Sequence, residues 1–125
     1  MSASVPSVAR TLTQPQLQAY ADASGDHNPI HIDPEFAATT PFGGTIAHGM
    51  LVLSLIGEMM FAAHGERWAA GGRLKVRFKA PTRPGDTVTA SAELVKQSEN
   101  AAEYAVQCAS QNGDVLIEGR ATVSV

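Results

Sequence analysis

The sequence predicts an α+β domain in which an antiparallel sheet wraps around one long central helix. Residues 47–63 are apolar on nearly every side, which is typical of a helix surrounded by other structure. Four segments with strand character follow between residues 73 and 125, and short connections favour an antiparallel meander for the last three. A buried helix followed by such strands indicates that the sheet packs around the helix.

Composition narrows the classes of function. At 125 residues the chain is expected to form one domain, residues 1–125, that buries roughly two-thirds of the unfolded surface. A formal charge of -3 without a basic block argues against nucleic acid as a partner. The single cysteine, Cys108, cannot form an internal disulfide, which fits a reducing compartment. We expect it to be a small buried residue in a strand.

No membrane segment is expected. Residues 1–10 lack the long apolar core of a signal peptide. His48 and Glu58 interrupt the most apolar region, residues 46–63, and the uninterrupted stretch between them is too short to span a bilayer. These features predict a soluble cytoplasmic protein.

The N-terminal part begins with a short strand, Val8–Leu12. Thr13 is a candidate N-cap, and Pro15 stands just inside a helix that extends to about residue 23. Three residues of this helix share the spacing of one buried face, namely Leu17, Tyr20 and Ala21. Gly25 is expected to end the helix.

Two loops and a helical turn precede the central helix. Residues 26–31 are expected to form the first loop, because Pro29 has no N–H and disfavours helix at the residue before it. Pro34 opens a helical turn over residues 35–38, and a second loop covers residues 39–45.

After the central helix the pattern changes to the period of two that is typical of half-buried strands. The strands are expected at residues 73–79, 87–97, 103–110 and 115–125. Residues 81–86 form a turn, and Asn112-Gly113 is a strong hairpin signal. Tyr104, Val106 and Cys108 fall on one face of the third strand.

The most informative segment covers residues 24–34, with the sequence SGDHNPIHIDP. It places the Asp26 carboxylate and the His31 imidazole five residues apart across a turn. Asn28 suits this turn because its amide hydrogen-bonds nearby backbone groups. A turned segment can aim Asp26 and His31 at one point, where an acid–base pair holds and activates a water molecule. We therefore interpret this segment as catalytic.

The chain resembles the MaoC-like family of (R)-specific enoyl-CoA hydratases and dehydratases, which have the hot-dog fold. The resemblance rests on Tyr20, on the motif of residues 24–33, and on Ala47-His48-Gly49-Met50 at the start of the long helix. Residues 76–81 and 84–86 resemble the family's first long strand and the turn after it. The resemblance spans most of the chain, and G-D-x-N-P-x-H is its specific core.

The resemblance implies the reversible addition of water to a trans-2-enoyl thioester, which gives a (3R)-3-hydroxyacyl product. Asp26 and His31 match the catalytic pair, and Gly49 matches the residue whose backbone N–H binds the thioester carbonyl. We expect Asp26 to accept a proton from water while His31 positions the water and helps to move a proton towards C2. The implied substrate is a thioester of coenzyme A or acyl-carrier protein, with no further cofactor. Family members of this size commonly pair into homodimers, with their sheets joined edge to edge.

Other polar residues near the motif are expected to support it. Asn28 and Ser24 would hold the segment in shape, and His48 would support it or donate within the start of the helix. For each of them a purely local structural role is the alternative. Tyr20 and Phe42 are expected to be packing residues.

No metal site is expected. Residues 22–28 space their oxygen atoms like a calcium loop, but His27 stands where that loop needs glycine. His27 and His31 are four residues apart, as in helical zinc sites, but Pro29 interrupts the helix that such a site requires.

Four cations could meet the phosphates of coenzyme A or of a carrier's phosphopantetheine. They are Lys75, Arg77 and Lys79 in one predicted strand and Arg83 in the turn after it. The alternative is a strand face that is simply exposed to solvent.

Other functions remain open from the sequence. Hot-dog thioesterases often use a carboxylate near the central helix, and Glu58 lies within this one, although we expect it to make a polar contact on the exposed side. A non-catalytic binding module would lack the acid–base pair, whereas a dehydratase subunit with an unlike partner would keep it. The accepted acyl length depends on the floor of the acyl tunnel, for which Gly57, Met59 and Met60 are candidates.

Overall fold

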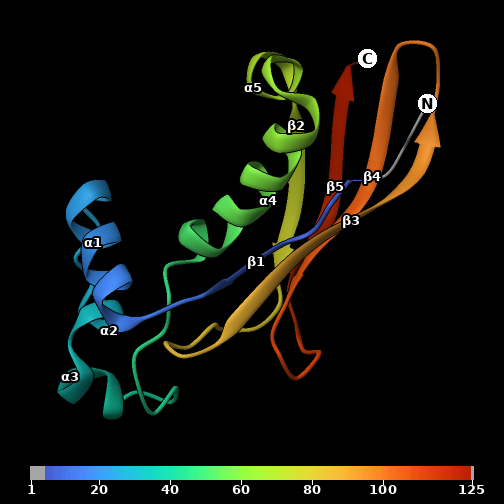
Figure 1. Ribbon diagram of the computed structural model, residues 1–125. Helices are drawn as coiled ribbons and strands as arrows, with labels where there is room; N and C mark the ends of the chain where they lie inside the picture. Colours follow the sequence, from blue (N-terminus) through green and yellow to red (C-terminus); the bar gives the residue numbers. More distant parts are fainter. Residues whose placement is uncertain (1–4, 125) are drawn as a thin grey trace.

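The computed structural model describes residues 5–124 and contains one five-stranded sheet with a long helix packed on it (Figure 1). In chain order the elements are β1 (Val8–Thr11), α1 (Gln14–Ser24), α2 (Pro29–Ile32), α3 (Pro34–Ala38), α4 (Gly49–His64), α5 (Glu66–Gly71), β2 (Arg73–Phe78), β3 (Thr87–Gln97), β4 (Ala101–Ala109) and β5 (Val115–Ser124). All strand pairs are antiparallel, and the order across the sheet is β1-β3-β4-β5-β2. The predicted α+β class and the antiparallel meander of the last three strands are confirmed.

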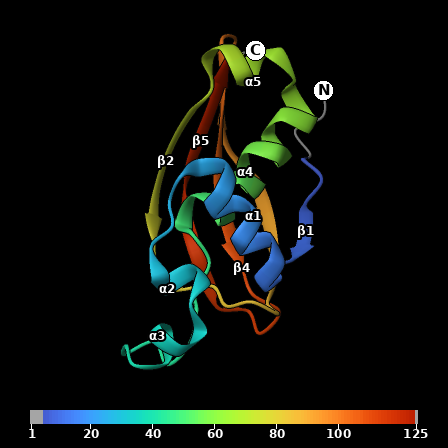
Figure 2. The ribbon, with the colours of Figure 1, turned by 90° about the vertical axis from the view of Figure 1, so that its left-hand side faces the viewer.

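Helix α4 packs along one face of the curved sheet, and α1, α2 and α3 gather near its N-terminal end (Figures 1 and 2). The buried residues of α4 are Val52, Leu55, Ile56, Met59 and Met60. They join one apolar cluster with alternate residues of β3, β4 and β5. Burial of such a side chain contributes about 1.5–3 kcal/mol, so this face holds α4 on the sheet. No helix within residues 5–124 has the combination of length and apolar character that crossing a membrane requires.

Strand β4 contributes the alternation that the sequence predicted. Tyr104, Val106 and Cys108 are 3%, 3% and 0% exposed and face the core. The Cys108 sulfur lies 3.7 Å from the carbonyl oxygen of Val52 in α4. Burial raises the pKa of the Cys108 thiol to about 11, so the expected small buried residue is confirmed.

The predicted hairpin between β4 and β5 is also confirmed. Gly113 adopts a φ of +85°, a conformation that glycine reaches without strain. The turn is closed by the Ser110 N–H, which donates to the Asp114 carbonyl over 2.9 Å.

Helix α1 has the ends that its sequence indicated. The Thr13 side chain accepts from the Gln16 N–H, and the Gln16 side chain accepts from the Thr13 N–H over 3.1 Å, which together form a capping box. Gly25 ends the helix with a φ of +82°. Leu17 and Ala21 are buried on the predicted face.

The loop predicted over residues 26–31 is wrong in its second half, because Pro29–Ile32 form the one-turn helix α2. Asn28 is its N-cap, and its side-chain oxygen accepts from the Ile30 N–H over 3.0 Å. Pro29 occupies the first helical position, where no N–H is needed and the fixed φ suits a helix. His31 therefore stands on a helical turn rather than in a loop.

Other boundaries differ by small amounts. Helix α4 begins at Gly49 rather than residue 47, because His48 is extended. Helix α5 was not predicted; only its Trp68 packs against the core, so the segment has no apolar period. The predicted end of the last strand at Val125 lies outside the described residues.

Gly119 in β5 lies where the backbone of β2 approaches β5 closely. A Cβ atom at this position would overlap the Lys75 carbonyl oxygen and lie 2.7 Å from the Val76 Cα, both of which belong to the backbone of β2. Gly119→Ala should therefore lower the free energy of unfolding by about 1–3 kcal/mol, as measured by denaturant titration. In the matched control Gly57→Ala, the new Cβ meets no atom within 4 Å, and helix propensity should stabilise the protein by about 0.5–1 kcal/mol. Equal effects of the two substitutions would contradict this account of the β2–β5 contact.

Candidate active site

Three segments meet at the N-terminal end of α4. Asp26 lies between α1 and α2, His31 lies on α2, and His48 is the N-cap of α4. One side-chain nitrogen or oxygen atom from each lies within 4.8 Å of those of the other two. The structure thus brings the predicted acid–base pair together and adds His48 to it.

The His31 ring is oriented by a bond to the backbone. Its Nδ1 lies 2.8 Å from the Ile46 carbonyl oxygen, which can only accept, so Nδ1 carries the hydrogen. In the neutral ring Nε2 is then a free acceptor. The half-buried His31 side chain also lines a pocket, so it can accept a proton from a group bound there.

His48 is buried and touches both members of the pair. Its Nε2 lies 3.0 Å from the Asp26 carbonyl oxygen, so this nitrogen donates. Its ring stacks on that of His31, with centroids 3.9 Å apart and planes 26° apart, and the Tyr20 ring packs nearby at 4.8 Å. The exposed fraction of His48 is 2%, and its Nδ1 finds no hydrogen-bond partner in the described part of the chain.

Asp26 is held by the turn around it. Its N–H donates to the Ser24 hydroxyl over 3.2 Å, and its carboxylate accepts from the Asn28 N–H over 3.3 Å. The Asn28 side chain in turn caps α2. Ser24 and Asn28 therefore shape the backbone that connects Asp26 with His31, while their predicted supporting roles in a reaction stay predictions.

A pocket of about 370 Å³ opens beside the first turn of α4. Its lining residues are His31, Phe42, Ile46, Ala47, Gly49, Val52, Phe78, Lys79, Ala80, Pro81, Thr82 and Ile117. The Phe78 ring lies so close to Gly49 that an added Cβ would meet Phe78 Cε1 at 2.9 Å. A larger residue at position 49 would therefore have to displace the exposed Phe78 ring, which lines the same pocket.

Gly49 is the first residue of α4, and its N–H donates no hydrogen bond to any residue among 5–124. The first N–H groups of a helix lack intrahelical acceptors and carry the positive end of the helix dipole. Such a donor stabilises negative charge that develops on a bound oxygen. The predicted acid–base pair and an N–H group without a partner among residues 5–124 therefore lie at the same end of α4.

By residue type, Asp26, His31 and His48 could also hold a divalent ion. The stacked rings argue against a shared ion, because the lone pair of each ring nitrogen lies in its ring plane and two planes only 26° apart do not bring these lone pairs to one nearby point. One nitrogen of each ring is already bonded to a carbonyl oxygen. The geometry favours acid–base chemistry, and the absence of a metal stays a prediction.

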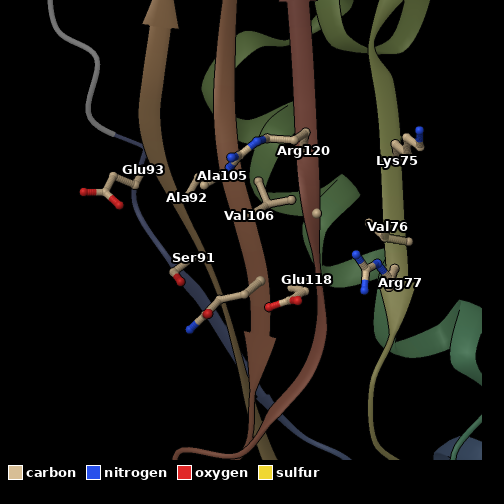
Figure 3. A pocket seen from close by; sticks show the side chains of 12 residues that line it. Lys75, Val76, Arg77, Ser91, Ala92, Glu93, Ala105, Val106, Glu118 and Arg120 are labelled. Atoms are coloured by element: carbon tan, nitrogen blue, oxygen red, sulfur yellow. The ribbon is translucent and has the colours of Figure 1, made fainter.

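The four predicted phosphate-binding cations are divided between surfaces. Lys75 and Arg77 line a separate hollow of about 640 Å³ on the outer face of the sheet, opposite α4 (Figure 3). Lys79 lines the pocket beside His31 and lies 3.6 Å from Glu118. Arg83 lies next to Gly44 in the loop before α4. Of the four, only Lys79 therefore lines the candidate pocket, and its amine is paired with Glu118.

Two residues at the site were missed from the sequence. The Gln14 side-chain amide donates to the His31 carbonyl over 2.8 Å and accepts from the Thr45 hydroxyl over 2.7 Å. A glutamine at the start of a helix and a threonine in a loop carry no local signal of such contacts.

The acyl-length candidates occupy other places. Met59 and Met60 are 0% exposed in the core, and neither they nor Gly57 line the pocket. The pocket is instead lined by Val52 from α4 and Ile117 from β5. The sequence does not distinguish these two pocket-lining residues from other core residues, so only the tertiary structure identifies them.

Comparison with known proteins adds independent information. A sequence model of the family described as "MaoC like domain" matches residues 3–112. The 3-hydroxyacyl-thioester dehydratase Z of Mycobacterium tuberculosis is 46% identical over an alignment of 89 positions, which covers 68% of this chain and 59% of that protein. The (R)-specific enoyl-CoA hydratase of Rhodospirillum rubrum is 36% identical over an alignment of 125 positions, which covers 95% of this chain and 83% of that protein. The match thus spans less than two-thirds of the first relative.

A solved structure has the same architecture. The (R)-hydratase from Aeromonas caviae involved in PHA biosynthesis superposes with a TM-score of 0.82 at 30% identity, and the match covers 100% of this chain and 98% of that one. This likeness confirms the expected hot-dog fold.

The hydrogen bonds of the two stacked rings predict opposite tautomers. Neutral His31 should carry its hydrogen on Nδ1 and neutral His48 on Nε2, because each nitrogen donates to a carbonyl oxygen. Long-range ¹H–¹⁵N NMR correlation at alkaline pH distinguishes the two forms, with His31→Gln and His48→Gln supplying the assignments. The His27 ring, whose Nε2 lies 3.0 Å from the Asp22 carboxylate, serves as an internal reference for the form with hydrogen on Nε2. The same tautomer in both stacked rings would contradict these hydrogen bonds.

Proposed function

Since this chain belongs to the MaoC-like family, we propose that it catalyses the reversible hydration of trans-2-enoyl-CoA to (3R)-3-hydroxyacyl-CoA. The observation that carries the proposal is the meeting of Asp26, His31 and the Gly49 N–H at one end of α4. The relatives named as hydratase and dehydratase support this reaction class.

Hydration adds the hydroxyl group of water to C3 and a proton to C2. When the oxygen of water bonds to C3, the C2=C3 electron pair moves towards the thioester and negative charge develops on its oxygen. The Gly49 N–H is suited to stabilise this charge by donating a hydrogen bond to the oxygen, since it lies at the positive end of a 16-residue helix. The enolate then takes a proton at C2.

Asp26 and His31 are proposed to handle the protons. The free Nε2 of neutral His31 holds the water by accepting one of its hydrogens, and the pair takes up the proton that the water loses. The same proton is returned to C2, so that acid and base are regenerated.

The substrate is proposed to be a thioester of coenzyme A or of acyl-carrier protein, with no further cofactor. The thioester itself supplies the carbonyl oxygen on which charge develops. Lys79 at the pocket and Arg83 near the preceding loop are the cations placed to meet its phosphates.

A second copy of the chain, or an unlike partner, is proposed to cover the pocket mouth. Phe42, Met50 and Phe78 are 40%, 58% and 55% exposed, and two of them line the pocket. Strand β2, which carries Phe78, is at the edge of the sheet and has free backbone groups for pairing. Both observations support association of sheets edge to edge.

Hydrolysis of the thioester is less well supported. Glu58, the carboxylate that a thioesterase of this fold would need, is exposed, forms an ion pair with Arg10 and does not line the pocket. A dehydratase subunit that acts on carrier-bound substrates uses the same site, and the relative named as a thioester dehydratase favours keeping this alternative.

Removal of either member of the pair should abolish most of the activity. Asp26→Asn and His31→Ala should each lower kcat by roughly 10²–10⁴-fold, since each removes a positioned proton acceptor. Glu58→Gln is the matched carboxylate control and should hydrate at nearly the wild-type rate. Near-normal hydration by both site variants would exclude the proposed mechanism.

The reaction itself is tested with crotonyl-CoA, by following the enoyl absorbance and free thiol together and by chiral analysis of the product. Loss of absorbance without thiol, with the (3R) alcohol as product, is the expected result. Thiol release that Glu58→Gln abolishes would replace hydration with hydrolysis. If neither occurs, hexenoyl-CoA and a crotonyl carrier protein are the next substrates, and inactivity on all three would overturn the proposal.

A further inference from the structure

The His31 ring is oriented by its hydrogen bond to the Ile46 carbonyl. Gln14 contacts both segments that form this bond, through the His31 carbonyl and the Thr45 hydroxyl. We propose that Gln14 is a positioning residue, which keeps His31 Nε2 aimed at the substrate by holding these two segments together. The kinetic part of this proposal rests on the proposed hydratase function, whereas its spectroscopic part does not.

The Gln14 amide uses both of its ends. Its nitrogen donates to the His31 carbonyl over 2.8 Å, which fixes the amide orientation because that oxygen can only accept. Its oxygen then faces the Thr45 hydroxyl, which donates to it over 2.7 Å. One side chain from α1 thus connects α2 with the loop before α4.

The two segments that Gln14 connects are those that determine the ring orientation. His31 Nδ1 donates to the carbonyl of Ile46, the residue directly after Thr45. The Ile46 N–H donates to the carbonyl of Ile30, the residue directly before His31, over 3.2 Å. Gln14 therefore closes a ring of hydrogen bonds around residues 30–31 and 45–46.

Neither segment is rigid by its own local structure. Helix α2 has only four residues, and a single helical turn is not stable alone. The loop before Thr45 contains Gly43 at a φ of +71° next to Gly44. An external support is therefore needed to hold a hydrogen bond between them in one geometry.

Gln14 can supply that support because its own backbone is fixed. It is the first residue of α1, directly after the Thr13 capping box. Leu17, one turn later, is 0% exposed in the core. Thr45 is 8% exposed, so its bond to Gln14 is largely shielded from competing water.

The kinetic test replaces the amide without changing the length of the side chain. Gln14→Met should lower kcat by roughly 10- to 100-fold with little change in KM, because a misplaced proton acceptor affects the transition state more than binding. Thr45→Val should lower kcat in the same direction, and Thr45→Ser, which keeps the hydroxyl, should restore it. Gln18→Met is the matched control. Gln18 is an exposed residue of the same helix, and its side chain hydrogen-bonds only to Asp22 among the described residues.

The spectroscopic test needs no activity. Gln14→Met should convert the single Nδ1–H tautomer of His31 into a mixture, seen as shifted or broadened ring nitrogen signals, while the His48 signals and the Gln18→Met spectrum stay unchanged. Thermal unfolding of each variant is recorded in parallel, and Gln14→Glu, which can accept from Thr45 but cannot donate to His31, provides a second variant if Gln14→Met does not fold.

The outcomes separate the two proposals. A folded Gln14→Met protein with wild-type kcat and an unchanged His31 tautomer would overturn the positioning role, and lowered stability alone would leave Gln14 a structural residue. Failure of the wild-type protein to hydrate any thioester would overturn the proposed function, and the tautomer of His31 would still decide the role of Gln14.

Discussion

The packing of α4 on the sheet is the interaction on which the rest of the structure depends. Its buried face joins the core of β3, β4 and β5 and thereby fixes where the helix begins. At the start of a helix the backbone N–H groups lack intrahelical acceptors, and a partial positive charge accumulates there. Hydrophobic burial along α4 thus determines the position of the Gly49 donor.

At the N-terminal end of α4, the His48 side chain contacts the candidate site and does not cap the helix. His48 occupies the N-cap but makes no side-chain capping bond, whereas a serine or aspartate there would typically stabilise a helix by about 1 kcal/mol. Its ring bonds to the Asp26 carbonyl instead, and its Nδ1 is left buried without a partner in the described residues. A buried polar group of this kind costs about 1–3 kcal/mol. The Gly49 and Met50 N–H groups donate to no residue among 5–124, and His31 gains a flat surface on which to stack.

The elements that the sequence predicted well are those whose signals are local. The Thr13 cap, the alternation of Tyr104, Val106 and Cys108, and the Asn112-Gly113 turn involve neighbours within one element, so their patterns survive without knowledge of the fold. Within the motif, the loop predicted over residues 26–31 is wrong in its second half. Pro29 does not break the helix there, because it occupies the first helical position. Helix α5 was missed because six residues with a single buried anchor have no period to detect.

By itself the sequence determined that a carboxylate and an imidazole lie five residues apart around a turn and that an apolar helix with a glycine at its start follows. The tertiary structure alone decided which other groups surround them. It showed that Lys75 and Arg77 are separated from the site, because α4 and the pocket lie on the other face of the sheet. It also brought Gln14 to His31, 17 positions away, because hydrogen bonds between distant segments depend on how those segments pack and leave no trace in local sequence.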